Sequence, residues 1–202
     1  MKYKLLIGSL ITIFSSVSYA APTTIDFDTL GSGVSVGSTY SAQGVTFSNA
    51  TTIASTVCAD NCAGSTSPTV IRSSSDLYNP TQASPIIATF DMDVSFVSLT
   101  GIDVGTDGFI LSVFDIFDNL IASDTAFGTT TAGVGEFFTL SLSGSGIRKV
   151  AFSQENQDAG LGDGMVFDNF TYDTASVPEA SSILLLGLGL AGLGFTRRKK
   201  VL

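Results

Sequence analysis

The 202-residue sequence predicts an all-β protein, an antiparallel β-sandwich, with an apolar targeting segment at each end. Short runs rich in β-branched and aromatic residues recur through the body, and Gly, Asp, Asn and Ser residues separate them. No stretch of the body shows the 3.6-residue periodicity of an amphipathic helix. These patterns are typical of a sandwich built from short antiparallel strands.

Eight segments of the body carry the strand signal, and turn residues follow each of them. In chain order they are 25–28, 44–48, 86–90, 94–104, 109–116, 137–142, 148–153 and 166–172. Residues 49–85 are rich in Ser and Thr, and we expect them to form a long excursion from the sandwich. The body therefore spans 21–173, and 174–176 form a polar linker.

The expected core follows from the two-residue period of a strand, which sends alternate side chains to one face. Alternate positions of 109–113 are apolar and are predicted to be buried. Val94, Phe96 and Leu99 are further core candidates. Because their spacing is not regular, the sequence predicts a change of phase near Val97.

Charge is distributed unevenly along the chain, whose formal net charge is -9. Residues 21–176 contain three of the nine basic residues and 17 of the 18 acidic residues, and so carry a net charge of -14. A field of that sign repels phosphate backbones, so we expect no nucleic-acid partner. The same field suits cations, including Ca²⁺.

The first 20 residues have the layout of a secretory signal peptide. Lys2 and Lys4 form a basic start, 5–17 are apolar, and 18–20 fit a small-x-small cleavage site. We therefore expect export and a mature chain that starts at Ala21. An uncleaved N-terminal anchor is the alternative.

The segment 177–202 is the second targeting segment. Residues 180–196 are apolar and rich in Leu and Gly, and their length is at the short end of what spans a bilayer as a helix. The sequence predicts a single transmembrane helix there. A basic cluster follows, which we expect to remain in the cytoplasm as a stop signal. It consists of Arg197, Arg198, Lys199 and Lys200.

Val177, Pro178 and Glu179, the apolar run and the basic end together resemble the PEP-CTERM sorting signal, a tail also labelled ice-binding-protein C-terminal domain. The family motif is Pro-Glu-Pro, and this chain has Ala180 in place of the second proline. The resemblance implies processing by an exosortase-like membrane enzyme. It implies delivery from the inner membrane of a Gram-negative bacterium to the cell surface or an exopolysaccharide matrix. A plain C-terminal anchor is the alternative.

The body also resembles the jelly-roll domains that often accompany this tail, through the strings at 25–28, 44–47 and 166–172. Lectin-like and carbohydrate-binding modules share this style of sequence. The resemblance implies a jelly-roll-like sandwich, and it does not identify a ligand, because one fold serves many functions.

Cys58 and Cys62 enclose three residues and are the two cysteines of the chain. An exported protein meets an oxidising compartment, so we predict a disulfide that pins the 49–85 excursion. Two cysteines without any histidine make poor zinc ligands, since a structural zinc site needs four nitrogen or sulfur ligands. Two reduced thiols are the alternative.

Asp168 has the phase of Val166, Phe170 and Tyr172 and is expected to point inward. A lone buried carboxylate is costly unless it is paired or bound to a metal. Oxygen ligands suit Ca²⁺, and the first and last strands of a sandwich are often neighbours. We therefore predict that Asp168 helps to hold a structural Ca²⁺, together with Asp26 or Asp28. Acceptance of backbone hydrogen bonds at a bulge is the alternative for Asp168.

Histidine is absent, which removes the usual general base and every Ser-His or Cys-His nucleophile pair. Glu136, Glu155 and the aspartates could supply a glycosidase carboxylate pair, but the sequence has no tryptophan for stacking on sugars. We therefore expect a non-enzymatic surface or matrix protein that contacts polysaccharide. A permanently anchored carbohydrate-binding module and a secreted glycan-active enzyme are the alternatives.

Overall fold

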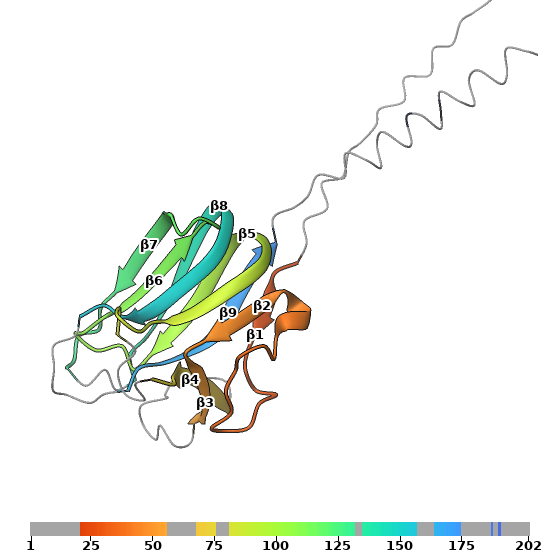
Figure 1. Ribbon diagram of the computed structural model, residues 1–202. Coiled ribbons are helices and arrows are strands. Elements are labelled where there is room, and N and C mark those ends of the chain that lie inside the picture. The colour runs from red at the N-terminus through yellow and green to blue at the C-terminus, as the bar shows by residue number, and fades with distance from the viewer. Residues whose placement is uncertain are drawn as a thin grey trace, which may run out of the picture. The chain divides into compact units, whose positions relative to one another are not determined.

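The computed structural model describes residues 21–55, 68–75, 81–131, 135–156 and 164–174, with the single positions 187 and 190. Residues Ala20–Ala175 form one compact unit. Its elements are β1 (Thr23–Ile25), η1 (Ser41–Gln43), β2 (Val45–Ser48), β3 (Ala50–Ala54), β4 (Thr69–Ser73), β5 (Ile86–Ile102), β6 (Phe109–Phe114), β7 (Leu120–Ala126), β8 (Phe137–Gln154) and β9 (Val166–Thr174). The prediction of an all-β fold is confirmed (Figure 1).

Every strand pair is antiparallel, and the main order is β3-β4-β9-β5-β8-β6-β7. Two short strands lie off this path, with β1 paired to β9 and β2 paired to β5. The first and last strands are therefore neighbours, as predicted. Thr24 lies opposite Thr171 in this pair, and their hydroxyl oxygens are 2.9 Å apart.

The long antiparallel pair of β5 and β8 runs through both layers of the sandwich (Figure 1). The first half of β5 pairs with β2 and the second half of β8, whereas its second half pairs with β9 and the first half of β8. The register shifts between Thr89 and Val94 mark the bend on β5. On β8 the bend contains Gly146, whose φ of 73° is the left-handed conformation that glycine adopts readily.

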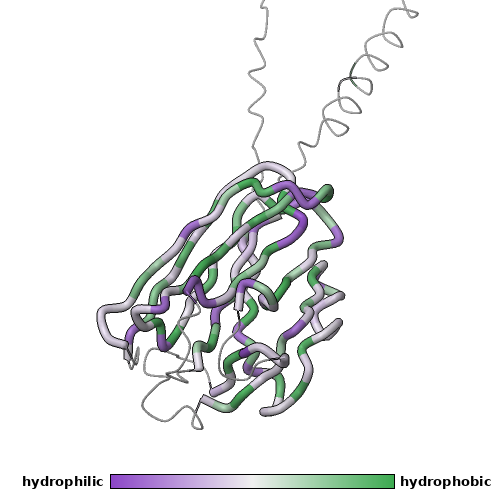
Figure 2. The backbone as a smooth tube through the Cα atoms, turned by 60° about the vertical axis from the view of Figure 1, so that its left-hand side comes forward, coloured by the Kyte–Doolittle hydropathy of each residue, from purple (hydrophilic) through white to green (hydrophobic). Residues whose placement is uncertain are grey.

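The core lies between the two layers and is unusually aromatic. Rings of β9 contact rings of the opposite layer, as in Phe167 with Phe152 at 4.9 Å and Tyr172 with Phe90 at 5.0 Å between centroids. Phe170 is fully buried among four other rings. Figure 2 shows hydrophobic and hydrophilic positions alternating along the strands, as expected when one face of each layer is buried.

The core predictions are confirmed with one exception. Phe109, Leu111 and Val113 of β6 are fully buried, and so are Val94 and Leu99 of β5. The prediction for Phe96 was wrong, because that residue is only half-buried and Val97 is buried instead. The predicted change of phase does occur, but it falls between Val94 and Phe96, where β5 has an irregular register.

Three strands were not predicted. β3 and β4 lie inside the segment expected to be an excursion, and they pair with each other over five residues. No strand was predicted between 116 and 137, where β7 lies and pairs with β6. Its pattern is weak because most of its side chains are half-buried or exposed at the edge of the sheet. The expected strands 86–90 with 94–104, and 137–142 with 148–153, each belong to one continuous strand.

No helix among the described residues is long and apolar enough to cross a membrane. The predicted signal peptide at 1–20 lies outside the described residues, as do Cys58 and Cys62 of the predicted disulfide.

Candidate functional site

A groove of about 240 Å³ lies on the outer face of the layer formed by β5, β8 and β6. Alternate residues of β6 and β8 point into the core, so the residues between them point outward. The register sets these outward residues side by side, with Phe114 opposite Lys149, Ser112 opposite Ala151 and Ile110 opposite Ser153. Ile87 of β5, Pro85 and Gln82 complete the lining. The groove is thus apolar along much of its floor, with hydroxyl, amide and ammonium groups around it.

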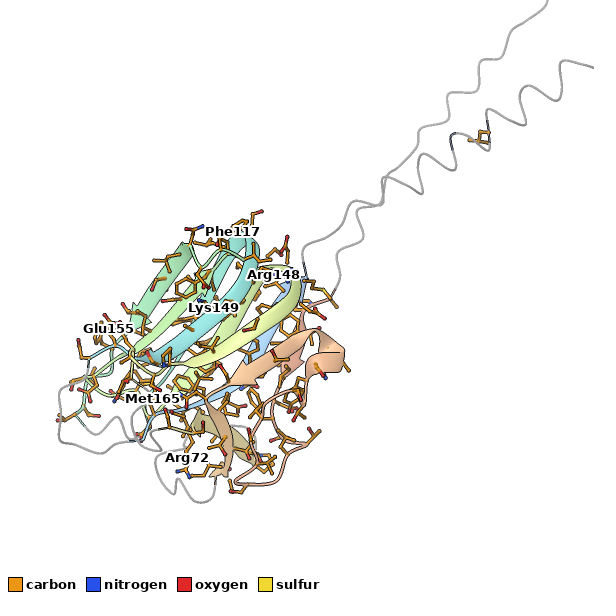
Figure 3. The ribbon with its side chains drawn as sticks, in the orientation of Figure 1. Arg72, Phe117, Arg148, Lys149, Glu155 and Met165 are labelled. Atoms are coloured by element: carbon orange, nitrogen blue, oxygen red, sulfur yellow. The ribbon has the colours of Figure 1, made fainter. Side chains whose placement is uncertain are left out.

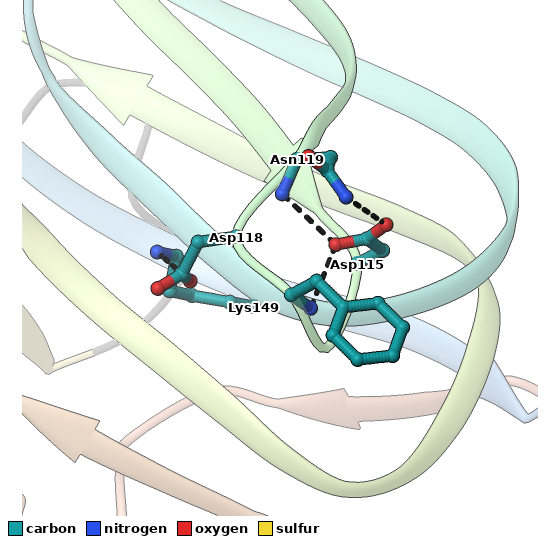
Figure 4. Close-up of polar contacts among 5 residues, drawn as sticks. Asp115, Asp118, Asn119 and Lys149 are labelled. Atoms are coloured by element: carbon teal, nitrogen blue, oxygen red, sulfur yellow. Dashed lines mark hydrogen bonds and ion pairs between the residues drawn. The ribbon is translucent and has the colours of Figure 1, made fainter.

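One end of the groove is marked by Lys149. Its ammonium lies 4.6 Å from the centre of the Phe114 ring, a cation–π contact. The same ammonium pairs with the carboxylate of Asp118, which belongs to the turn between β6 and β7. Lys149 therefore ties this turn to the end of the groove (Figure 4).

The turn between β6 and β7 is held by one carboxylate (Figure 4). Asp115 Oδ1 accepts hydrogen bonds from the backbone N–H groups of Phe117 at 2.8 Å and Asn119 at 2.9 Å. Its Oδ2 accepts a third from the Asn119 side-chain amide at 2.8 Å. These bonds lower the pKa of Asp115, and the bond from the Asn119 side chain has the largest effect.

This ordered turn presents apolar side chains to solvent. Phe117 is 81% exposed, and Ile116 and Leu120 are also exposed. Asp118 at the turn has a φ of 65°, in the left-handed region that Asp tolerates. We call residues 115–120 the hairpin tip. Because Asp115 fixes the backbone, the hairpin tip holds the Phe117 ring in the open without the support of a core.

The other end of the groove is closed by a side-chain contact. The amide of Gln82 donates hydrogen bonds to the Glu155 backbone oxygen at 2.7 Å and to Glu155 Oε2 at 2.9 Å. In Figure 3, Phe117 and Glu155 lie toward opposite ends of the layer, with Lys149 between them. The groove therefore runs along the strands, with one carboxylate at each end.

Glu136, the other glutamate considered for a glycosidase pair, lies in the connection before β8. Its carboxylate accepts hydrogen bonds from the backbone and hydroxyl groups of Thr129 and Thr130. These bonds lower the pKa of Glu136, and the bond from the Thr129 hydroxyl has the largest effect. The carboxylates of Glu136 and Glu155 thus accept hydrogen bonds from different segments of the chain.

The lowered pKa values of Asp115 and Glu136 predict acid sensitivity. A carboxyl whose pKa is lower in the folded state adds stability while it is ionised, and this contribution is lost as the pH falls through the folded pKa. We expect the free energy of unfolding to be steady above about pH 5 and to decrease below about pH 4. Chemical denaturation from pH 7 to pH 3 measures this slope. The double variant Asp115→Asn, Glu136→Gln should show a shallower slope, and an unchanged slope would contradict the assignment.

Asp168 is fully buried, as predicted, but for a different reason. β9 carries a bulge at Asn169, whose φ is 54°, and the pairing with β5 shifts register there. Phe167 and Phe170, three residues apart, both enter the main core, so Asp168 does not share the phase of Phe170. Asp168 Oδ1 accepts a hydrogen bond from the Asn169 N–H at 2.7 Å. This matches the backbone role considered as the alternative.

Asp26 and Asp28 are exposed. Asp26 Oδ1 accepts a hydrogen bond from the Asp28 N–H, and Asp28 Oδ1 accepts one from the Thr69 N–H, both at 3.2 Å. Within the described part of the chain, no three His, Cys, Asp or Glu side chains form a group that could hold a metal ion. A Ca²⁺ site built on Asp168 with Asp26 or Asp28 would therefore need further oxygen ligands, and it stays a prediction.

Calcium binding to the folded state would raise the melting temperature, because a ligand that binds only the native state stabilises it. At a Ca²⁺ concentration 100 times its dissociation constant the gain is about 2.7 kcal/mol, or roughly 5–10 °C for a domain of this size. We expect the rise in CaCl₂ relative to EDTA to disappear in Asp168→Asn. A wild-type melting temperature that is the same in CaCl₂ and EDTA would contradict the prediction.

The groove and the hairpin tip were not identified from the sequence as a site. The predicted sorting residues, by contrast, lie outside the described residues. They are Val177, Pro178, Glu179, Arg197, Arg198, Lys199 and Lys200.

Comparison with solved structures gives remote likenesses. The K2 cleaved adhesin domain of Lys-gingipain is 15% identical, with 80% of this chain and 94% of that chain covered and a TM-score of 0.39. The arabinose-bound MgGH51 α-L-arabinofuranosidase is 15% identical, with 79% of this chain and 27% of that chain covered and a TM-score of 0.45. A DUF4465 family protein from Bacteroides ovatus is 14% identical, with 57% of this chain and 63% of that chain covered and a TM-score of 0.34.

No curated protein matches the chain. One family model does match, at the segment singled out above, and its description is PEP-CTERM protein-sorting motif. The predicted resemblance of the tail is thereby confirmed. Such a motif implies export, sorting to the surface and processing by an exosortase-like enzyme. Residues 176–199 of this chain are a PEP-CTERM protein-sorting motif.

Proposed function

We propose that this protein is a non-enzymatic component of the cell surface or extracellular matrix, delivered by its sorting tail and held there by contacts of its β-sandwich with polysaccharide. The sorting motif at 176–199 is the observation that carries the proposal. Cleavage near Pro178 and Glu179 would release the body from the membrane, so its retention would depend on the body's own contacts.

The properties of the body support this function. The unit Ala20–Ala175 has its own aromatic core and can persist after loss of the tail. It carries an outer groove that combines apolar and hydrogen-bonding side chains, as ligand sites commonly do. The absence of histidine from the sequence disfavours most nucleophilic and acid–base chemistry.

The test is the intact mass of the native protein from separated membrane, matrix and medium fractions. We expect a matrix or surface form that starts near Ala21 and ends near Glu179. A membrane form that still ends at Leu202 would instead establish a permanently anchored protein and overturn the sorting part of the proposal. Release of sugar from a glycan panel by the purified body would overturn the non-enzymatic part.

A further inference from the structure

We propose that the outer groove binds a segment of an uncharged polysaccharide chain, and that the Phe117 ring of the hairpin tip contacts the same chain. The inference rests on the proposed function, since it names the site and the class of polysaccharide. It is carried by the shape of the groove, by its chemistry and by its charge.

The shape of the groove suits a chain segment. It runs along β8 from Lys149 to Ser153 and along β6 from Phe114 to Ile110. The four steps from Lys149 to Ser153 cover about 13 Å, so the groove is long for its volume of about 240 Å³. It lies on the outer face of the layer, where a polymer can enter sideways, whereas a small metabolite usually lies in a more enclosed pocket.

The chemistry of the groove matches a sugar ring, which has faces of C–H bonds and a rim of hydroxyl groups. Ile87, Ile110 and Ala151 supply an apolar floor, and the Phe114 ring lies at one end. Ser112 supplies a hydroxyl that is 2.9 Å from the hydroxyl of Ser123. Since a hydroxyl can donate once and accept twice, this pair retains capacity for hydrogen bonds to a ligand.

Charge decides between acidic and uncharged polysaccharides. Lys149 is the single cation in the lining, and it is already paired with Asp118. Glu155 adds a second carboxylate at the other end, through its contact with Gln82. The groove surroundings are thus net negative, within a body whose net charge is -14 between residues 21 and 176. An acidic chain would be repelled, so an uncharged chain is the ligand that fits.

The hairpin tip extends this surface at the Lys149 end. Phe117 is 81% exposed, the largest exposed fraction among the large hydrophobic side chains that the structure describes. The Asp115 hydrogen bonds fix the turn before any ligand arrives, so little ordering is needed on binding. Rigid aromatic groups of this kind commonly dominate binding surfaces.

The test uses the fragment 21–175, which corresponds to the compact unit with its own core. Affinity electrophoresis would compare uncharged probes (dextran, laminarin, xylan and galactomannan) with acidic ones (alginate and hyaluronate). We expect retardation by at least one uncharged polysaccharide and by neither acidic one. Stronger retardation by alginate or hyaluronate would overturn the charge argument.

Two pairs of variants test the site on the best-bound probe. Phe117→Ala should weaken binding roughly tenfold, whereas Phe137→Ala, at another exposed phenylalanine, should not. Ala151→Phe should fill the groove and abolish binding, whereas Ser143→Phe, on the same strand outside the groove, should not. Melting temperatures near that of wild type would show that all four variants are folded.

The outcomes separate the site from the proposed function. Binding that survives in Ala151→Phe and Phe117→Ala would overturn the groove inference and leave the proposed function standing. The wild-type fragment could instead bind none of the probes and fail to rebind a polysaccharide matrix from which protein has been removed. That result would overturn both the groove inference and the proposed function. Binding lost equally in the matched control variants would also overturn the inference, because it would show a general loss of structure.

Discussion

Replacement of Phe170 by alanine is expected to remove about 3–5 kcal/mol from the free energy of unfolding. Phe170 is fully buried, and its ring lies 5.3–6.3 Å from the rings of Phe47, Phe90, Phe152 and Tyr172. These four rings come from β2, β5, β8 and β9, so the cavity would open at the junction of both layers. Native domains are stable by about 5–15 kcal/mol, so this loss is a large fraction of the free energy of unfolding. Chemical denaturation of the fragment 21–175 measures the loss.

Phe137→Ala is the matched control for this variant. Phe137 is 53% exposed at the start of β8, and substitutions at such surface positions usually change stability by less than about 0.5 kcal/mol. Phe170→Leu should lie between the two, because leucine leaves a smaller cavity. A loss in Phe170→Ala no greater than that in Phe137→Ala would show that the aromatic cluster is not the core described here.

The fold class could be predicted because the alternation of residues is a local property. Phe109, Leu111 and Val113 have the same period in the sequence and in the core. The position of a bulge depends on how two strands fit together, which the sequence of one strand does not contain. The burial of Phe96, and the phase of Asp168 relative to Phe170, were mispredicted for that reason, since each residue lies next to a shift of register in β5 or β9.

The division of the sheet into layers was also beyond local reasoning. Turn-rich positions 91–93 and 143–147 suggested that a strand ends and another begins there. Instead, β5 and β8 each continue through the bend as one strand of a long antiparallel pair. The edge strand β7 was missed for a related reason. The side chains of Leu120–Ala126 are half-buried or exposed, so the segment shows no alternation of apolar and polar residues. Only its pairing with β6 identifies it as a strand.

The groove could not be predicted because its lining is assembled across strands. Phe114 and Lys149 are 35 residues apart in the sequence and lie opposite each other in the register of β6 and β8. The ion pair with Asp118 and the cation–π contact follow from that register. The tail, by contrast, could be predicted, because a sorting motif is a linear pattern along the chain. The match at 176–199 falls on the segment that its apolar run and its basic end had indicated.

Deletion of residues 177–202 is expected to abolish delivery to the surface and to leave the body as a soluble periplasmic or secreted protein. The deletion removes almost all of the matched motif, including Pro178, Glu179 and the basic end, but leaves the compact unit intact. An exosortase-like enzyme would then have nothing to recognise, while the N-terminal segment could still direct export. Cell fractionation with antibodies to the body measures the change, which should be nearly complete.

Deletion of Val201 and Leu202 alone is the matched control, because these residues follow the matched segment and should leave sorting unchanged. The pair Pro178→Ala, Glu179→Ala separates recognition from anchoring, since it keeps the apolar run and the basic end. We expect that variant to accumulate in the membrane with its tail uncleaved, whereas the protein that lacks 177–202 should be absent from the membrane. A truncated body that still pellets with membranes would show that its attachment does not depend on the tail, and the assignment of 180–196 as the membrane segment would be wrong.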